Sequence, residues 1–477
     1  MRPAIDPKQP LPVYVQLKTL LLEEILSGQY GPGERLPTEH EMCARYGISR
    51  TPVNRALSEL ADEGVVLRHR RRGSFVNPHW VQHHPSPREV RIIVPDGCWE
   101  ALVREAVPDD LTLNIVSVDL SDLHQVLVRA VAEGRAPDIA VLDSVWVHEF
   151  AASGFLMPLD ELDADWVRDE YEQDFLEPFR SANTLDGRPV AVQAEADVAG
   201  IWYRRAHVAA AGQEPPRTWA ELAALGQVLA GPGRPIPLTL PAGSRAGETA
   251  TYCLLSLLAS NGATVLDREA VTLDSPAAAD CLAFLRQLLD SGVIPADAVA
   301  YDRHRPIRQL AQGQASMAFG GSYDAPALAA VAGVTTDDVL DVFGFIGMPT
   351  GPNGGAATLA GGMVYGIFRQ ASAPQLAMRV LREITSSDAL ARMSRATWQI
   401  ASRRSAVDRA AATAPLLRAT GPLLEQAVVR PVTAQYPRVS VQLQSMLEAV
   451  LTGRMEPHAA TARTAEMISA ITGRPLA

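Results

Sequence analysis

The chain has 477 residues, of which 47% are hydrophobic and 20% are charged. A chain of this length exceeds what one hydrophobic core supports, and its composition is typical of folded domains, so we expect about three compact units. The start lacks the apolar run of a secretory signal, and no apolar window approaches about 20 residues. We therefore expect a cytoplasmic protein with no membrane partner.

Charge and cysteine usage exclude several function classes. Residues 1–80 carry a net charge of +2 and the remainder carries −13, so only the N-terminal segment is a candidate for nucleic-acid binding. The only lysines are Lys8 and Lys18, which excludes a Schiff base or a P-loop lysine further along. The 4 cysteines form no C-x-x-C pair. We expect no metal site and no cofactor.

The N-terminal segment is predicted to begin with two helices. Apolar residues recur at helical spacing from about Val13 to Ile25. A Gly-Pro-Gly turn follows at 31–33, and Thr38 with Glu41 has the spacing of a capping box that begins a second, short helix.

A third helix and two strands complete this segment. Ser49 can cap a helix that extends to about Ala61 and displays Arg50, Thr51 and Asn54 opposite its apolar stripe. Apolar strands are predicted on either side of a basic turn at 70–73. The order is that of a winged helix-turn-helix.

The blocks PVYVQL, ILSGQYGPGERLPTEHEM, YGISRTPVNRALSELADEGVV and RRRGSFV resemble, in order, the heads of GntR-family regulators. The resemblance implies a double-stranded DNA operator, with the third helix in the major groove and the wing tip on the minor groove. His40 and Asn54 stand where the family commonly has arginine, and asparagine favours adenine. The expected DNA-binding residues are Thr38, His40, Ser49, Arg50, Thr51, Asn54, Arg55, Arg70, Arg72 and Gly73.

The rest of the chain reads as a linker and an α/β body. Residues 1–78 form the DNA-binding domain, 79–89 the linker and 90–477 the body. From residue 90 strands alternate with helices, which predicts a parallel, three-layer lobe. Ligands of such sheets bind at the carboxyl ends of the strands, which places 96–99 and 143–146 at one rim.

The body resembles family 1 extracellular solute-binding proteins, the sugar receptors of importers. The blocks that carry the likeness include GRAPDIAVLD, FAASGFLMPLDEL, LAQGQASMAFGGSYD and FGFIGMPTGPNGGAATLAGGMVYGIF. The resemblance implies a two-lobed, type II periplasmic-binding-protein fold with its ligand between the lobes. Lobe 1 is expected to span about 90–195 and 360–400, and lobe 2 about 196–359 and 401–477.

A sugar site needs aromatic faces for C–H surfaces and polar groups for hydroxyls. Asp197 occupies the acidic hinge position of the family, although Ala194 and Glu195 replace the aromatic residues usually found just before it. The expected ligand-binding residues are Trp99, Asp143, Trp146, Glu195, Asp197, Tyr323, Gly362, Trp398 and Arg403.

The sequence thus predicts a regulator whose operator affinity is modulated by a mono- or oligosaccharide, and which works as a homodimer. Two alternatives are weighed. A transport receptor would require a secretory signal and would not carry a DNA-binding head. A glycoside hydrolase could use Glu195 and Asp197, but residues two apart on a strand share a face and cannot flank one bond. We expect no enzyme and no catalytic residue.

Overall fold

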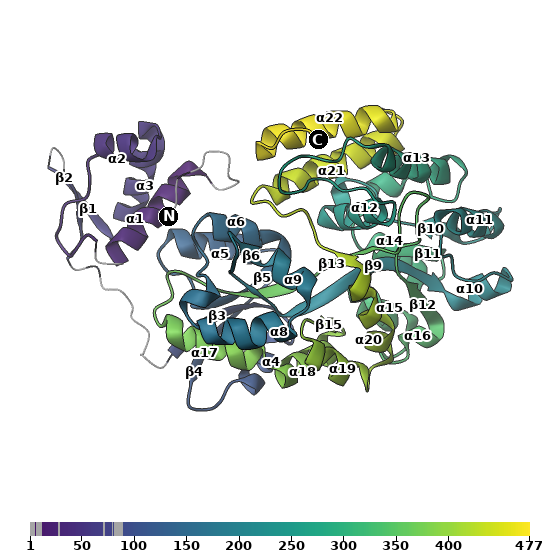
Figure 1. Ribbon diagram of the computed structural model, residues 1–477, viewed down its shortest axis with the longest axis horizontal. Coiled ribbons are helices and arrows are strands. Elements are labelled where there is room, and N and C mark those ends of the chain that lie inside the picture. The colour runs from purple at the N-terminus through teal and green to yellow at the C-terminus, as the bar shows by residue number, and fades with distance from the viewer. Residues whose placement is uncertain (1–4, 6–11, 27–28, 70–71, 79, 81–88) are drawn as a thin grey trace. The chain divides into compact units, whose positions relative to one another are not determined.

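The N-terminal head consists of three helices and a two-stranded wing (Figure 1). The computed structural model describes residues 5, 12–26, 29–69, 72–78, 80 and 89–477. The elements of the head are α1 (Val13–Leu26), α2 (Glu39–Tyr46), α3 (Arg50–Asp62), β1 (Val66–His69) and β2 (Gly73–Val76). The two strands pair antiparallel, with His69 opposite Gly73. The predicted winged helix-turn-helix is confirmed.

One hydrophobic core holds the three helices of the head together. Leu17 and Leu21 on α1 and Val53, Leu57 and Leu60 on α3 are each at most 1% exposed and belong to one cluster. Their spacing places them on one face of each helix, so burial of these faces fixes how α1 packs on α3.

The ends of the helices follow from local hydrogen bonds. The backbone N–H of Glu41 donates to Oγ1 of Thr38 at 3.2 Å, and that of Thr38 donates to the Glu41 carboxylate at 2.7 Å, which confirms the predicted capping box. Ser49 precedes α3 but makes no side-chain capping hydrogen bond. The expected side-chain cap at Ser49 was therefore wrong, and its hydroxyl is exposed.

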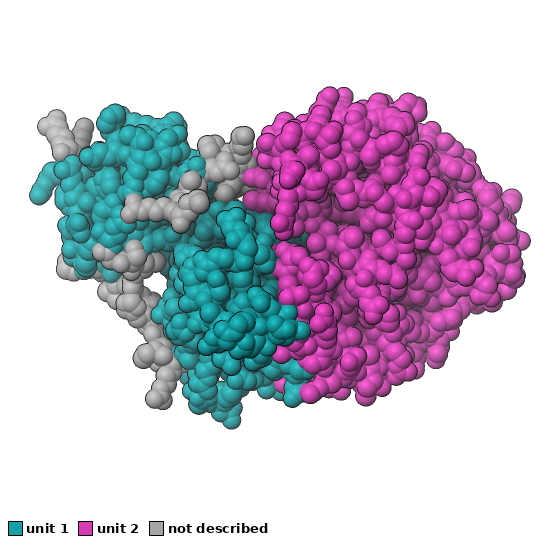
Figure 2. Space-filling view, in the orientation of Figure 1, with its two compact units in different colours: residues 1–173, 183–192, 363–389 teal, residues 174–182, 193–362, 390–477 magenta. Residues whose placement is uncertain are grey.

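The chain divides into two compact units (Figure 2). Unit 1 comprises residues 1–173, 183–192 and 363–389, and unit 2 comprises 174–182, 193–362 and 390–477. The two units meet at 192/193, 362/363 and 389/390. The corresponding boundaries predicted from the sequence for the two lobes were about 195, 360 and 400. Residues 174–182, predicted for lobe 1, belong to unit 2.

Unit 1 contains, in addition to the head, a five-stranded sheet. Its order is β4 (Thr112–Val118), β3 (Glu89–Pro95), β5 (Ile139–Asp143), β14 (Met363–Ile367) and β8 (Val192–Gln193). β3 pairs parallel with β4 and β5, as predicted, and β14 runs antiparallel to β5. Residues 139–142 are fully buried, which is typical of a strand covered on both faces. The main helices are α4 (Trp99–Ala106), α5 (Leu123–Ala132), α6 (Val147–Ala152) and α17 (Pro374–Ile384).

Unit 2 contains a larger sheet built around one long strand, β9 (Glu195–Arg204). The order is β10 (Ile236–Thr239), β11 (Ala315–Gly321), β9, β13 (Thr358–Gly361) and β16 (Ala427–Val428), and β12 (Phe343–Ile346) and β15 (Ile400–Ala401) also pair with β9. The longer helices of unit 2 are α11 (Trp219–Leu229), α12 (Glu248–Ser260), α13 (Pro276–Asp290), α18 (Ser387–Thr397), α21 (Tyr436–Leu451) and α22 (Pro457–Thr472). The shorter helices of unit 2 are α9 (Glu177–Ala182), α10 (Arg205–Ala210), α14 (Arg305–Ala311), α15 (Ala325–Ala332), α16 (Val339–Val342), α19 (Arg404–Ala411) and α20 (Pro415–Thr420), and α8 (Glu172–Asp174) crosses the boundary between the units.

Candidate functional site

The predicted DNA-contacting side chains of the head are mostly exposed. Thr38 and Gly73 are partly buried, and Arg70 lies outside the described residues. Gly73 has a φ of 106°, a conformation that favours glycine, where the wing returns to the head. The exposed residues are His40, Ser49, Arg50, Thr51, Asn54, Arg55 and Arg72.

A network of charged and polar side chains joins α2, α3 and the wing. Nε of Arg50 donates to Glu39 at 2.6 Å, and Nη2 of Arg68 donates to the other oxygen of Glu39 at 2.9 Å. Nη1 of Arg68 donates to Oδ1 of Asn54 at 3.1 Å and to Oγ of Ser58 at 2.6 Å. Glu39 and Arg68 were missed by the sequence analysis, and together they orient Arg50 and Asn54 before any DNA is bound.

Arg55, by contrast, is held by contacts inside the head. Its guanidinium carbon lies 3.7 Å from the ring centroid of Tyr14, Nη2 donates to the Tyr14 hydroxyl at 3.0 Å, and Nε donates to Glu59 at 3.2 Å. The structure therefore gives Arg55 a role in fixing α1 against α3, and its expected DNA contact stays a prediction.

Unit 1 holds three of the predicted ligand-binding residues. Asp143 ends β5, where its side chain accepts the backbone N–H of Val145 at 3.1 Å. The ring of Trp146 lies edge-on to His124, with centroids 5.0 Å apart, and remains partly exposed. Trp99 is only 6% exposed and packs edge-on against Tyr365 inside the unit, so its contact in this structure is one of packing.

In unit 2, Glu195 and Asp197 lie at the start of β9, where neighbouring strands meet it. Asp197 pairs with Gly361 of β13, and Glu195 pairs with Ala401 of β15. A Cβ on Gly362 would lie 2.1 Å from the carbonyl oxygen of Glu195, so only glycine allows this close backbone approach. The structure thus brings the predicted Glu195, Asp197 and Gly362 together.

Aromatic side chains converge on Asp197 from two other elements. The hydroxyl of Tyr252, on α12, donates to Oδ1 of Asp197 and also lies 3.2 Å from the carbonyl oxygen of Leu359. Tyr323 follows β11 in a 3₁₀ turn at Ser322–Asp324, and its ring centroid lies 5.9 Å from that of Tyr252. Two phenol rings therefore stand beside a carboxylate, the combination of groups that a sugar site requires.

Arg430 supplies the positive charge of this cluster. Its guanidinium carbon lies 4.9 Å from the ring centroid of Tyr252, and its Nε donates to Glu248 at 2.8 Å. Glu248 also accepts from the hydroxyl of Tyr436 at 2.6 Å and from that of Ser440 at 2.6 Å. Arg430 is therefore anchored by its ion pair with Glu248 and lies against the ring of Tyr252.

Burial raises the pKa values of the acidic side chains in and near this cluster. It raises the pKa of Glu195 to about 7, against a hydrogen bond with Thr397, and the charge of Asp197 adds to the rise. Burial likewise raises the pKa of Asp324 to about 7 and raises that of Asp197, where Arg430 and the Tyr252 hydroxyl oppose the shift. Perturbed acids of this kind concentrate at functional sites.

The last two predicted ligand-binding residues have other contacts in unit 2. Trp398 is partly buried against the apolar side chains of two core clusters, and its φ of 59° is rare for a non-glycine residue. The side chain of Arg403 is 9% exposed, and its Nε donates to Asp174 at 2.7 Å. Both residues flank β15, which pairs with β9 at Glu195.

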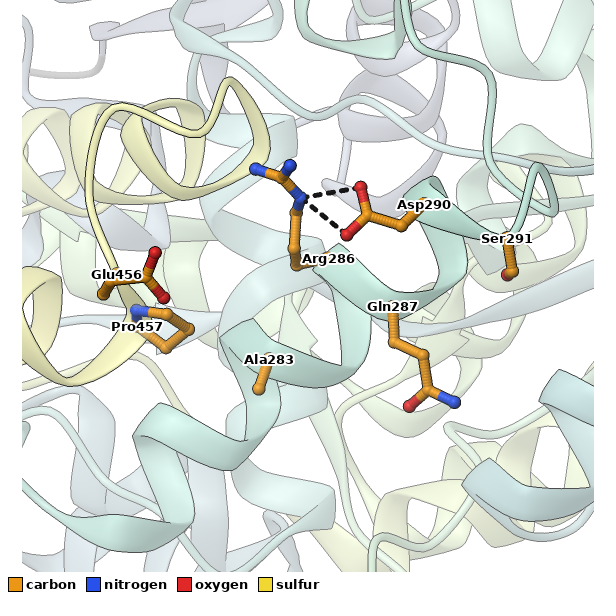
Figure 3. A pocket seen from close by; sticks show the side chains of 7 residues that line it. All are labelled: Ala283, Arg286, Gln287, Asp290, Ser291, Glu456 and Pro457. Atoms are coloured by element: carbon orange, nitrogen blue, oxygen red, sulfur yellow. Dashed lines mark hydrogen bonds and ion pairs between the residues drawn. The ribbon is translucent and has the colours of Figure 1, made fainter.

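A second candidate on unit 2 is a surface hollow between α13 and the start of α22 (Figure 3). Arg286 and Asp290 form an i,i+4 ion pair at 2.8 Å there, and the Asp290 side chain is 55% exposed. The lining residues are Ala283, Arg286, Gln287, Asp290, Ser291, Glu456 and Pro457. This lining offers no aromatic face for a sugar, so the cluster around Asp197 is the stronger candidate.

The sequence analysis missed the partners that complete the Asp197 cluster. Asp324 adjoins the predicted Tyr323, so the GGSYD block could have indicated it. Tyr252, Glu248 and Arg430 lie in segments far from β9 along the chain, and no local pattern marks them.

Residues 99–391 match the family model described as bacterial extracellular solute-binding protein, and this match covers more than half of the chain. The chain belongs to this family. Residues 13–76 of this solute-binding family member match the model for bacterial regulatory proteins of the gntR family. Both predicted resemblances are confirmed, and neither family is one of enzymes.

Relatives divide between the two parts of this solute-binding family member. The uncharacterized HTH-type transcriptional regulator YurK of Bacillus subtilis (strain 168) is 42% identical over 65 residues, 14% of this chain and 27% of YurK. A binding protein of Brucella abortus (strain 2308) is 24% identical over 260 residues, 53% of this chain and 59% of that protein. The chain thus spans less than two thirds of the curated relatives it matches.

Solved structures resemble the body. The cyclic alpha-maltosyl-1,6-maltose binding protein from Arthrobacter globiformis has a TM-score of 0.70 and 26% identity, over 81% of this chain and 99% of that one. The predicted two-lobed fold of the body is thereby confirmed. Within the described ranges, no helix is long and apolar enough to cross a membrane, and no group of three or more His, Cys, Asp or Glu residues is placed to hold a metal ion.

Proposed function

We propose that this protein is a cytoplasmic transcriptional regulator that binds operator DNA through α3 and the wing. The exposed start of α3 supports this role, because Arg50, Thr51 and Asn54 are polar side chains of the kind that contact phosphates and base edges. The Glu39 and Arg68 contacts hold two of them in place, which lowers the ordering cost of binding.

The effector is a carbohydrate held by the C-terminal domain, and it modulates operator affinity. The observation that carries this proposal is the convergence of Asp197, Tyr252, Tyr323 and Arg430 in a domain of the solute-binding family. Carboxylate and guanidinium groups bind hydroxyls, and phenol rings cover C–H faces. The sugar named for the Arthrobacter relative supports the same class of ligand.

The test is a screen of mono- and disaccharides for thermal stabilisation of the full chain. A sugar that binds only the folded state adds about 2.7 kcal/mol of stability at 100 times its Kd. The expected result is that at least one sugar raises the unfolding temperature in proportion to the logarithm of its concentration. A complete set of sugars without effect would contradict the proposal.

A further inference from the structure

The amide of Asn54 on α3 is held by an arginine of the wing. Nη1 of Arg68, on β1, donates to Oδ1 of Asn54 at 3.1 Å and to Oγ of Ser58 at 2.6 Å, and Nη2 donates to Glu39 on α2 at 2.9 Å. The Arg68 side chain is 31% exposed and that of Glu39 is 22% exposed. A planar guanidinium that serves three partners at once is fixed in direction, and Arg68 therefore fixes the group that it contacts on Asn54.

The chemistry of the two side chains decides which end of the amide faces Arg68. The oxygen and the nitrogen of an amide have nearly the same shape, but a guanidinium carries donors only, and the amide has one acceptor, its oxygen. An amide turned end over end would place donors against donors. Asn54 therefore keeps Oδ1 toward Arg68. Among the described residues, none accepts a hydrogen bond from Nδ2 of Asn54, and the side chain is exposed.

This orientation changes which base Asn54 can recognise. Asparagine pairs with adenine when its oxygen accepts from N6 and its nitrogen donates to N7, so both ends of the amide are needed. Because Oδ1 of Asn54 already accepts from Arg68, the NH2 group is the end left for DNA. That group donates only, and guanine presents two adjacent acceptors, N7 and O6, in the major groove.

We propose that Asn54 binds guanine in the operator through its NH2 group, and that Arg68 is the positioning residue that sets this preference. This inference rests on the proposed function, since it assumes that α3 lies in the major groove. A single donor nitrogen can serve both N7 and O6, as that of a lysine does. The cation at Oδ1 also polarises the amide, which strengthens its NH2 group as a donor.

The experiment begins with selection of bound sequences from a randomised duplex library by the full chain. The same selection with Asn54→Ala identifies the operator position that Asn54 reads, because the preference at that position alone should be lost. The expected base there in the wild-type selection is guanine. By fluorescence anisotropy, the guanine duplex should bind about 5- to 150-fold more tightly than the adenine duplex, the range for one good pair of base contacts.

Replacement of Arg68 tests the positioning role. Arg68→Met removes the donor to Oδ1 and frees the amide, so the order should reverse and the adenine duplex should bind more tightly. A purely structural role would weaken both duplexes by the same factor. Arg45→Met is the matched control, because Arg45 also forms an ion pair within the head, at 2.6 Å with Glu24, and is 29% exposed. This control should leave the ratio of the two affinities unchanged.

A second variant keeps the inference testable if Arg68→Met does not fold, which thermal unfolding checks. Asn54→Asp retains an acceptor for Arg68 and removes only the NH2 donor. It should therefore abolish the guanine preference while the head stays folded.

The outcomes separate this inference from the proposed function. Adenine at the Asn54 position of the wild-type operator would overturn the inference, as would a base preference that Asn54→Ala, Asn54→Asp or Arg68→Met leaves unchanged, and regulation through α3 would stand. If the full chain enriches no sequence from the library, the proposed function fails and the inference fails with it.

Discussion

The phenol of Tyr252 donates a hydrogen bond to Oδ1 of Asp197 across 55 positions of the chain. This contact directs one carboxylate oxygen toward α12, and the backbone N–H of Gly361 also donates to the Asp197 carboxylate. Asp197 is therefore both oriented and partly buried before ligand arrives, as preorganised sites require.

Replacement of this carboxylate should weaken sugar binding. Asp197→Ala is expected to cost about 1.5–3 kcal/mol of sugar affinity, the range for a hydrogen bond to a charged group. Calorimetry with the sugar found in the thermal screen measures the change. Operator binding without sugar should survive, and Asp341→Ala, at an exposed position of α16, serves as the control in the same unit. Wild-type sugar affinity in the Asp197 variant would show that Asp197 does not contact the sugar and has only a structural role.

Loss of the Glu195 charge should stabilise the protein at alkaline pH. Between pH 4.5 and about 7 the unfolded chain has released the Glu195 proton and the folded chain still holds it, so the free energy of unfolding falls as pH rises through this window. Glu195→Gln should remove this fall and raise the free energy of unfolding at pH 8 by up to about 3 kcal/mol. Below pH 4.5 the two proteins should differ little.

Chemical denaturation at pH 4, 6 and 8 measures this difference. Asp341→Asn, at an exposed position of α16, is the matched control. A Glu195→Gln protein that is less stable than wild type at pH 8 would show that the ionised carboxylate is needed by the fold, contrary to the burial that raises the pKa of Glu195.

The start of α3 should determine operator affinity. Arg50→Ala should weaken operator binding about 10- to 100-fold, as for loss of one base or paired phosphate contact, with sugar affinity unchanged. Fluorescence anisotropy with labelled operator measures it. Arg104→Ala on α4, an exposed i,i+4 partner of Glu100, is the control. Full operator affinity in the Arg50 variant would remove this residue from the interface.

The predicted oligomeric state follows from the way winged helices bind DNA. One head reads one half-site, so we predict a C2 dimer on a pseudo-palindromic operator. Light scattering should give a mass near twice that of one 51.3 kDa chain. A monomer at working concentration, with a footprint over a single unrepeated site, would be inconsistent with this prediction.

The local features of the fold could be predicted because short segments specify them. The capping box of Thr38 and Glu41 and the parallel pairing of β3 with β4 and β5 depend on residues close in sequence or on regular alternation. Ser49 failed as a side-chain cap although its backbone is extended as a cap residue should be. The sequence alone does not determine whether a serine hydroxyl hydrogen-bonds to the backbone or to solvent.

The candidate site was predictable only in part. Asp197 and Tyr323 were found through the family blocks, whereas Tyr252 and Arg430 approach them from helices and loops remote in sequence. Arg403 illustrates the opposite case. Its charge suggested a ligand, but it pairs with Asp174 at 2.7 Å, a contact that depends on tertiary packing.

The central claim is that sugar binding and operator binding are coupled in one chain. Because such coupling is reciprocal, a sugar that changes operator affinity must bind the DNA-bound protein differently by the same factor. The most direct measurement is anisotropy of labelled operator titrated with the protein, without sugar and with a saturating concentration of the stabilising sugar. The account predicts that sugar changes the operator Kd by about 5- to 150-fold. The Asp197→Ala protein should need a higher sugar concentration to give the same change. An operator Kd that is identical with and without a sugar shown to bind would contradict it.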